Sequence, residues 1–257
     1  MAAKWTLITG ASEGLGVEFA RIAAGEGRDL ILVARQAEKM ERLAEDLRAR
    51  HRIAVEVWPV DLADPEAVET LWRKVALRRH IEIVVNNAGL GASGPFAGTN
   101  LDREMSSIMV NVVALTILTK RAVAHMIQQG GGRILNIGST AGFMPGPNLA
   151  VYHATKAYVL SLGEALAEEL RGMPVTVTTL CPGPTATNFA RDAGMERITL
   201  FTVLRPADAA AVARAGWQAM KAGRRVKVTG ALNWLFSVGP RFVPRALVPR
   251  IASIFLK

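Results

Sequence analysis

Short apolar runs alternate with longer segments of helical periodicity, and this alternation restricts the fold more than any other feature of the chain. The runs are WTLIT, LILVA, AVEVWPV, IEIVVNN, GRILNIG, VTVTTLCPG and RVKV, with helical patterns between them at about 15–28, 37–50, 65–78, 101–129, 152–171 and 207–222. Strands separated by helices form a parallel sheet with helices on both faces. We therefore predict an α/β fold, a doubly wound parallel sheet of about seven strands. A chain of 257 residues of this kind is expected to be one domain.

The formal net charge of +9 is compatible with attraction to nucleic acid, anionic lipid or anionic small molecules. The basic residues are scattered, however, and the short basic clusters ALRRH and KAGRRVK lack the interleaved aromatic residues of a single-strand binder. Helix-turn-helix and zinc-finger spacings are also missing from the sequence. We therefore expect no nucleic-acid partner.

Cysteine and histidine usage argues against disulfides and metal sites. The single cysteine, Cys181, excludes an internal disulfide, and the four histidines show no spacing that would gather metal ligands. An apolar strand begins by about residue 5, which leaves no room for the charged and apolar regions of a signal peptide. We expect a cytoplasmic protein without a metal.

The residues that follow the apolar runs are the candidates for ligand binding, because ligands of a doubly wound sheet bind at the carboxyl ends of its strands. The segments there are GASEGLG, RQ, DLAD, NNAG, STAG and PGPTATN. In the first, Gly10, Gly14 and Gly16 permit a tight turn, close approach of a pyrophosphate to a helix N-terminus, and close helix packing. The spacing is not GxGxxG, and a plain strand-to-helix connection would also use glycine.

A second feature is the pair Tyr152 and Lys156 in VYHATKAYVL, four residues apart in a helical pattern. Their Cβ atoms would lie one turn apart, at about 5–6 Å. Taken alone, the pair is compatible with ordinary packing in which the lysine extends past a half-buried ring.

TGASEGLG, NNAG, Ser139, YHATK and CPG occur in the order and at the spacing of the short-chain dehydrogenase/reductase family, which the chain resembles from residue 5 to about 190. The resemblance implies a single-domain Rossmann-type oxidoreductase, closest to the NADP-dependent carbonyl, ketoacyl and steroid reductases, with a small-molecule carbonyl or alcohol as substrate. A non-catalytic NADP-binding sensor or regulatory protein on the same scaffold is the alternative.

Four residues form the catalytic set that the resemblance implies. Tyr152 would be the acid that protonates a carbonyl oxygen, and the charge of Lys156 would lower the pKa of this phenol, which is ordinarily near 10. Ser139, 13 residues before Tyr152, would hold the substrate oxygen, although a serine can also cap a turn. Asn111 lies in a strongly apolar helix, where a buried amide needs partners; in the family it bends the helix and holds a water that leads to the lysine.

The end of the second strand bears on the choice of cofactor. An acidic residue there would bind the ribose 2′-hydroxyl of NAD, whereas Arg35 suits the 2′-phosphate of NADP, so NADP(H) is favoured. Glu13 departs from this pattern, because such reductases often have a second base at its position. Asp61 would meet the adenine side or simply cap the next helix. The expected cofactor residues are Gly10, Ser12, Glu13, Gly14, Leu15, Gly16, Arg35, Asp61, Leu62, Asn87, Ala88, Gly89, Tyr152, Lys156, Pro182, Gly183, Thr185 and Thr187.

Residues 184–205 lie where the family keeps a variable substrate lid, within a catalytic domain that we place at 1–230. Apolar side chains there favour a lipophilic ketone or acyl chain, or they merely close the lid onto the domain. The candidate substrate residues are Phe143, Met144, Phe189, Met195 and Phe201.

Residues 231–257 form an apolar and basic C-terminal tail that prolines at 240, 244 and 249 divide. It could lie on an anionic membrane surface, cover the substrate pocket or be buried at a subunit contact, and packing on the domain or a subunit interface is favoured over the membrane. The long apolar helices at 101–129 and 152–171 further predict a homodimer or homotetramer.

Overall fold

The computed structural model describes residues 4–196, 198 and 205–256. Seven parallel strands form one sheet in the order β3-β2-β1-β4-β5-β6-β7. The strands are β1 (Lys4–Thr9), β2 (Asp29–Ala34), β3 (Val55–Pro59), β4 (His80–Asn86), β5 (Gly132–Ile137), β6 (Val175–Cys181) and β7 (Val226–Val228). The predicted doubly wound parallel sheet of seven strands is therefore confirmed.

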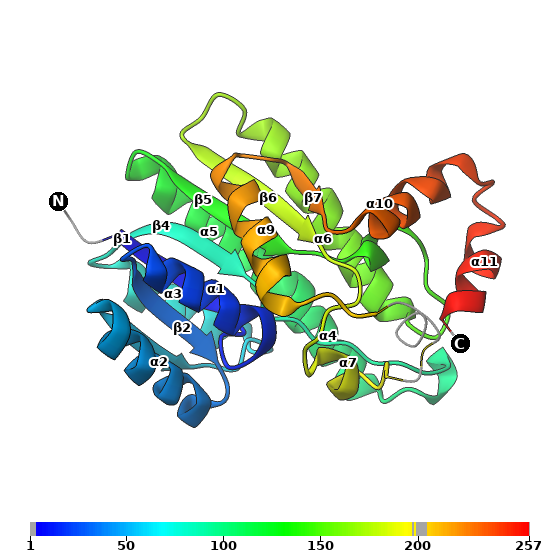
Figure 1. Cartoon of the computed structure of the whole chain (residues 1–257), viewed down its shortest axis with the longest axis horizontal. Coiled ribbons are helices and arrows are strands. Elements are labelled where there is room, and N and C mark those ends of the chain that lie inside the picture. The colour runs from blue at the N-terminus through cyan, green and yellow to red at the C-terminus, as the bar shows by residue number, and fades with distance from the viewer. Residues whose placement is uncertain (1–3, 197, 199–204, 257) are drawn as a thin grey trace.

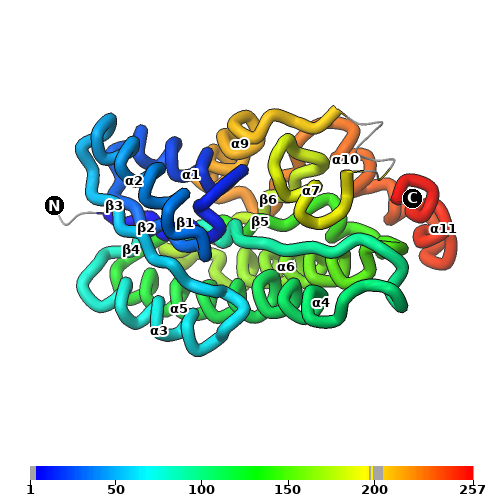
Figure 2. Tube along the Cα trace, turned by 90° about the horizontal axis from the view of Figure 1, so that it is seen from below, coloured from blue at the N-terminus to red at the C-terminus, as the bar shows by residue number. Residues whose placement is uncertain are grey.

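Helices cover both faces of this sheet, so the molecule has three layers (Figures 1 and 2). One layer holds α1 (Gly14–Gly25), α2 (Ala37–His51) and α9 (Ala209–Lys221). The opposite layer holds α3 (Pro65–Ala76), α4 (Leu101–Ile108), α5 (Leu115–Gln128) and α6 (Ala150–Glu169). The short helix α7 (Phe189–Asp192) follows β6.

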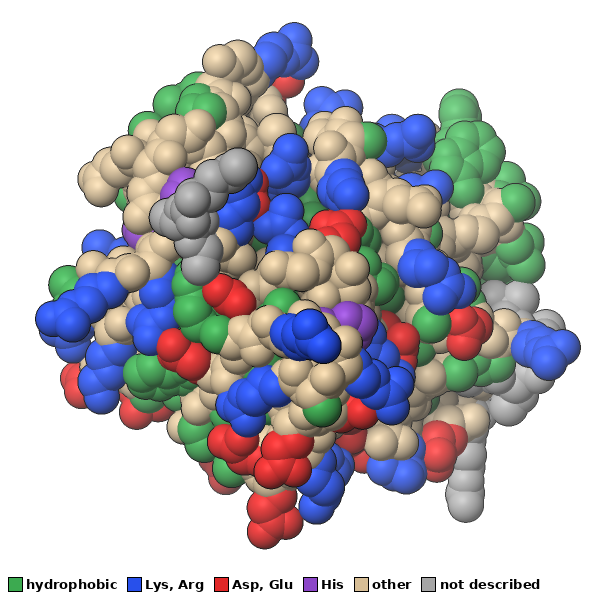
Figure 3. Space-filling view, turned by 60° about the vertical axis from the view of Figure 1, so that its left-hand side comes forward, with side chains coloured by type: hydrophobic (Ala, Val, Ile, Leu, Met, Phe, Trp, Pro, Cys, Tyr) green, Lys and Arg blue, Asp and Glu red, His purple; other side chains and the backbone are tan. Residues whose placement is uncertain are grey.

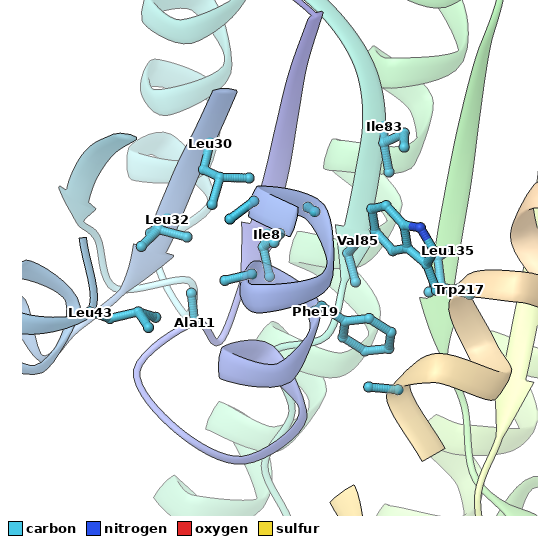
Figure 4. Close-up of a cluster of buried hydrophobic side chains, with 14 of the residues drawn as sticks. Ile8, Ala11, Phe19, Leu30, Leu32, Leu43, Ile83, Val85, Leu135 and Trp217 are labelled. Carbon is cyan, nitrogen blue, oxygen red and sulfur yellow. The ribbon is translucent and has the colours of Figure 1, made fainter. Parts of the chain in front are cut away.

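Each helix layer forms its own hydrophobic core with the sheet. In Figure 4, Phe19 of α1 and Trp217 of α9 lie against Leu135 of β5, and Ile8 and Leu32 continue the cluster across β1 and β2. Phe19, Ile8 and Leu32 are fully buried. Each such side chain stabilises the fold by about 1.5–3 kcal/mol relative to an exposed position. These two cores fix the strand ends from which the site is built.

The sheet changes its winding direction between β1 and β4, which are neighbours although two strands separate them in the sequence. The pairing of Ile8 with Val85 on one side and with Leu32 on the other fixes the register there. Loops after β1 and β4 diverge at such a point and leave a crevice for a ligand.

The long helix predicted at 101–129 is divided into α4, the π-helical segment η2 (Met109–Ala114) and α5. By length and composition, the 28 residues Leu101–Gln128 could cross a membrane. However, Val110, Ala114 and Leu118 belong to the core between this helix and the sheet. We read the helix as a core helix.

The tail forms two short helices, α10 (Ala231–Val238) and α11 (Val248–Phe255), joined by the 3-10 turn η4 (Gly239–Phe242). Both lie at one end of the molecule, at the right of Figure 1. Pro240 stands in η4 and Pro249 in the first turn of α11, because proline is tolerated at a helix start but not in its interior.

Candidate active site

The carboxyl ends of the strands border a cavity of about 640 Å³, which extends from the glycine turn after β1 to helices α10 and α11. Every expected cofactor residue except Gly16 lines it, and so do Ser139, Tyr152 and Lys156. Asn111 does not line the cavity itself. Among residues 4–196, 198 and 205–256, no three His, Cys, Asp or Glu side chains are gathered as metal ligands would be.

The glycine turn is shaped by close backbone approach. Gly10 has φ +64°, and a Cβ atom there would lie 2.8 Å from Nδ2 of Asn87 and 2.9 Å from Cα of Ala88. A Cβ atom on Gly16 would overlap the carbonyl oxygen of Gly10. Gly16 therefore packs α1 closely onto the turn, and it does not itself line the cavity. The turn leads into the N-terminus of α1, where backbone N–H groups favour an anion.

Asn87 holds the crevice between β1 and β4 in shape. Its side chain donates hydrogen bonds to the carbonyl oxygens of Thr9 (2.9 Å) and Gly10 (3.1 Å). In return, the Thr9 hydroxyl accepts from the backbone N–H groups of Asn87 and Ala88, both at 3.0 Å. The NNAG motif thus joins two strand ends that the topology has brought together.

Arg35 and Asp61 lie at the end of the cavity near β2 and β3, and both are exposed. The Asp61 carboxylate accepts a hydrogen bond from the Ala63 N–H (3.0 Å), so it also shapes its own loop. Glu13 is engaged elsewhere: its carboxylate lies 3.4 Å from the Lys39 ammonium and accepts a hydrogen bond from Nδ2 of Asn188 (2.9 Å). The sequence carried no local signal for these two partners of Glu13, because one lies 26 residues away and the other 175.

Tyr152 and Lys156 face the cavity from the first turns of α6, and both are buried. The Lys156 ammonium lies 5.8 Å from the centre of the Tyr152 ring and donates to the Ile137 carbonyl oxygen at 2.9 Å. The hydroxyl of Ser139 accepts from the Ala141 N–H (3.1 Å), so this serine caps the 3-10 turn η3 (Thr140–Phe143) and also lines the cavity.

Burial dominates the protonation of this pair. It raises the pKa of Tyr152 to about 12, and a hydrogen bond with Ser139 opposes that rise. It lowers the pKa of Lys156 to about 8. The pKa of the phenol therefore lies above its ordinary value near 10 even with Lys156 beside it, because burial has the largest effect on it.

Asn111 lies in η2 and is 1% exposed. Its Oδ1 accepts from the Leu90 N–H (2.9 Å), and its Nδ2 donates to the Leu90 carbonyl (2.8 Å) and the Thr155 hydroxyl (3.0 Å). A Cβ atom on Gly89 would lie 3.4 Å from Asn111 Oδ1 and 3.5 Å from Lys156 Nζ. The amide therefore links the loop after β4 to α6, directly behind the lysine.

The far end of the cavity is apolar. Met144, Phe189 and Met195 line it, and the Phe189 and Tyr152 rings lie 5.5 Å apart. Phe143, the last residue of η3, does not line it, whereas the next residue, Met144, has extended backbone and does. Phe201 falls outside the described residues.

The tail also contributes residues to the cavity, and the sequence alone did not identify which ones. Ala252 and Leu256 of its last turns belong to one hydrophobic cluster with Tyr152 and Met195. The other tail residues that line the cavity are Asn233, Phe236 and Phe255. Val248, Ala252 and Leu256 recur every four residues, and this spacing was the available signal for a buried helix face.

The glycine turn at the N-terminus of α1 and the polar strand ends that line the cavity are features of a dinucleotide site. A family model for short chain dehydrogenases matches residues 4–197. The chain belongs to the short-chain dehydrogenase family. It is 32% identical over 227 residues to an uncharacterized oxidoreductase of Bacillus subtilis. The aligned region covers 88% of this chain and 82% of that protein.

Other short-chain dehydrogenases show the same likeness. The very-long-chain 3-oxoacyl-CoA reductase of Pyrenophora tritici-repentis is 36% identical over 65% of this chain, which spans only 50% of that protein. A short-chain dehydrogenase from Sphingobium yanoikuyae in complex with NADPH superposes with a TM-score of 0.83, at 32% identity and 93% coverage of each chain. One from Burkholderia phymatum in complex with NAD gives 0.80, at 25% identity and 92% coverage of each. Members of the family bind a nicotinamide cofactor and act on small molecules, and this short-chain oxidoreductase is one of them.

Proposed function

We propose that this short-chain dehydrogenase is an NADP(H)-dependent reductase of a lipophilic ketone or acyl substrate. The observation that carries the proposal is the position of Tyr152, between the Lys156 ammonium and the apolar end of the cavity that begins at the glycine turn. A nicotinamide cofactor bound along this cavity would supply the hydride. The residues of the chain would supply the proton and the alignment.

Tyr152 would donate its proton to the carbonyl oxygen of the substrate, as a general acid. The Ser139 hydroxyl, which lines the cavity together with the phenol, would hold that oxygen in place. Lys156 would stabilise the phenolate that remains, because its ammonium faces the ring at 5.8 Å in a buried site where charges interact strongly. Asn111 would keep α6, and with it Lys156, in position against the loop after β4 through its hydrogen bonds to Leu90 and Thr155.

Arg35 supports NADP over NAD. Its guanidinium stands at the end of β2, where a carboxylate would be needed to bind a free ribose 2′-hydroxyl. Glu13, which would oppose a 2′-phosphate, is paired with Lys39 at 3.4 Å and hydrogen-bonded to Asn188. The positive charge of Lys39 thereby offsets the negative charge of Glu13, although Lys39 lies outside the glycine-turn motif.

Apolar walls support a lipophilic substrate. Met144, Phe189 and Met195 line the cavity beside Tyr152, and the tail adds Phe236 and Phe255. Two of the family relatives fit this view, since one acts on very-long-chain 3-oxoacyl-CoA and another, from Comamonas testosteroni, is an alcohol dehydrogenase specific for bulky-bulky ketones.

The test is NADPH oxidation with a panel of aliphatic, steroidal and acyl-thioester ketones, comparing the parent with Tyr152→Phe. We expect Tyr152→Phe to lower kcat by about 10²–10⁴, the usual contribution of general acid catalysis, and to leave the Kd for NADPH within about twofold. Tyr158→Phe is the matched control, because Tyr158 lies on the same helix, is partly exposed and hydrogen-bonds Thr116.

Reduction by Tyr152→Phe within tenfold of the parent would contradict the proposed role of the phenol. A parent that binds NADPH tightly and reduces no ketone of the panel would instead favour the non-catalytic alternative.

A further inference from the structure

Helix α11 is apolar on two opposite sides. Its inner side is the buried set Val248, Ala252 and Leu256. On its outer side, Ile251 and Ile254 are 44% and 63% exposed, and Leu247 precedes them by one turn. Leu247, Ile251 and Ile254 follow the i, i+4, i+7 spacing of one helix face. The inner side of α11 is already buried in the fold, so a second set of large apolar side chains on the exposed side is expected to have a binding partner.

Helix α10 and the turn η4 also expose large apolar side chains. Trp234 and Leu235 are 58% and 57% exposed, and Phe242 is 83% exposed. Of the fifteen exposed large hydrophobic side chains in the described part of the chain, eight lie between residues 231 and 256. The concentration of these side chains in one short segment distinguishes the tail from the rest of the surface, where single exposed apolar residues need no explanation.

The charge of the same region identifies the partner. Residues 209–257 contain nine of the 31 Lys and Arg residues and none of the 22 Asp and Glu residues, so the rest of the chain is balanced at 22 of each. On the body of the molecule, acidic and basic side chains lie side by side (Figure 3). Arg241, Arg245 and Arg250 are exposed, and Arg250 falls on the same face of α11 as Ile254, four residues on.

We propose that the outer face of α10, η4 and α11 docks the protein on an anionic lipid surface. Such a surface accepts apolar side chains into its headgroup boundary and attracts basic ones. A second copy of the same face would satisfy the apolar residues but would set uniformly basic segments against each other, which is unfavourable. The pocket-lining Phe236, Phe255 and Leu256 belong to the same two helices, so the lipid face and the apolar end of the cavity share one structural unit.

Sedimentation with vesicles tests the proposal on the full chain. We expect binding to vesicles of equal parts phosphatidylglycerol and phosphatidylcholine at about 0.1 M salt, and its loss at about 1 M salt, where the screening length falls from about 10 Å to about 3 Å. Vesicles of phosphatidylcholine alone should bind at least tenfold more weakly. Because these measurements need no turnover, their failure is distinguishable from failure of the proposed reductase activity.

Two variants separate the apolar from the electrostatic contribution. Ile251→Gln with Ile254→Gln should weaken vesicle binding at least tenfold, and Arg241→Glu, Arg245→Glu and Arg250→Glu together should weaken it at least a hundredfold. The matched controls change exposed residues elsewhere on the molecule and should bind within about twofold of the parent. They are Leu77→Gln with Phe96→Gln, and Arg42→Glu with Arg52→Glu and Arg78→Glu.

Absence of sedimentation by the parent would overturn the proposal, and so would an equal loss of binding in the matched charge control. A change from oligomer to monomer in Ile251→Gln with Ile254→Gln, without vesicle binding by the parent, would assign the face to a subunit contact and overturn it as well.

Discussion

Substitution of Asn111 by alanine measures how much the buried amide contributes to the fold. The change removes three hydrogen bonds, to the Leu90 N–H, the Leu90 carbonyl and the Thr155 hydroxyl. Asn111 is 1% exposed and Thr155 is 3% exposed, so water cannot readily replace the lost partner at Thr155. Leu90 is half-buried, so water can compensate its two backbone groups in part.

The magnitude follows from these three groups. Each of the two half-buried Leu90 groups left without a partner costs about 1 kcal/mol. The Thr155 hydroxyl keeps its bond to the Tyr152 carbonyl (2.8 Å), so it loses one hydrogen bond worth about 0.5–1.5 kcal/mol, and Asn111→Ala should cost about 3 kcal/mol in all. For a domain of this size, 1 kcal/mol shifts the Tm by about 2–4 °C, so the Tm should fall by roughly 10 °C. Asn100→Ala is the control on the same long helix, because Asn100 makes only one cap bond, to the Arg103 N–H (3.0 Å), worth about 1 kcal/mol.

The assay is thermal unfolding followed by circular dichroism, with amide hydrogen exchange of Leu90 as a local readout. Faster exchange at Leu90 should accompany the lower Tm. If Asn111→Ala lowered the Tm no more than Asn100→Ala, the three hydrogen bonds would not support the fold as argued. If exchange at Leu90 stayed at the parent rate, the loop after β4 would not depend on this amide.

Three further predictions address cofactor, pH and assembly. Arg35→Asp should reverse the preference for NADPH over NADH in kcat/KM, because a carboxylate repels a 2′-phosphate and binds a free 2′-hydroxyl; a parent that already prefers NADH would contradict the role of Arg35. Lys156 is charged below its pKa of about 8 and neutral above it, so kcat/KM for ketone reduction should fall as the pH rises through 8. Lys156→Arg should move that fall to higher pH, because arginine keeps its charge. A parent profile of kcat/KM that stays flat to high pH would exclude the titration of Lys156. The exposed Leu101, Met105 and Tyr158 on the long helices lead us to expect a dimer or tetramer by light scattering, and a mass of 27.6 kDa at micromolar concentration would show a monomer.

Local sequence signals were sufficient for the sheet and for the glycine turn. A strand buried on both faces reads as a continuous apolar run, and LILVA behaves in this way as β2. Gly10 has the positive φ that a tight turn needs, so its role was visible in the sequence. The predicted helix at 101–129 was correct in extent, but the hydrogen-bond partners of Asn111 in its π-helical segment, Leu90 and Thr155, lie far from it in the sequence.

Features that depend on the packing of distant segments were not predictable in the same way. Lys39 and Asn188 reach Glu13 only after α2 and the loop after β6 have been placed beside α1. Phe143 and Met144 were both expected at the substrate because of their position after Ser139, but only Met144, where the chain leaves the 3-10 turn in extended conformation, lines the cavity. The apolar composition of the tail was evident, whereas its contact with the Tyr152 cluster required the fold.

The opposite pKa shifts of Tyr152 and Lys156 have a single origin. Burial disfavours the phenolate and the ammonium alike, which raises the pKa of Tyr152 to about 12 and lowers that of Lys156 to about 8. With Lys156 protonated and Tyr152 neutral, this part of the cavity holds one positive charge removed from water. Donation of the phenol proton to a substrate oxygen would convert that lone charge into a neutral ion pair, so the penalty that opposes ionisation of Tyr152 alone is reduced when the lysine is charged. The ability of Tyr152 to donate its proton is therefore a property of the pair. Because both groups are buried, the phenolate and the ammonium attract each other more strongly than they would at the same distance in water.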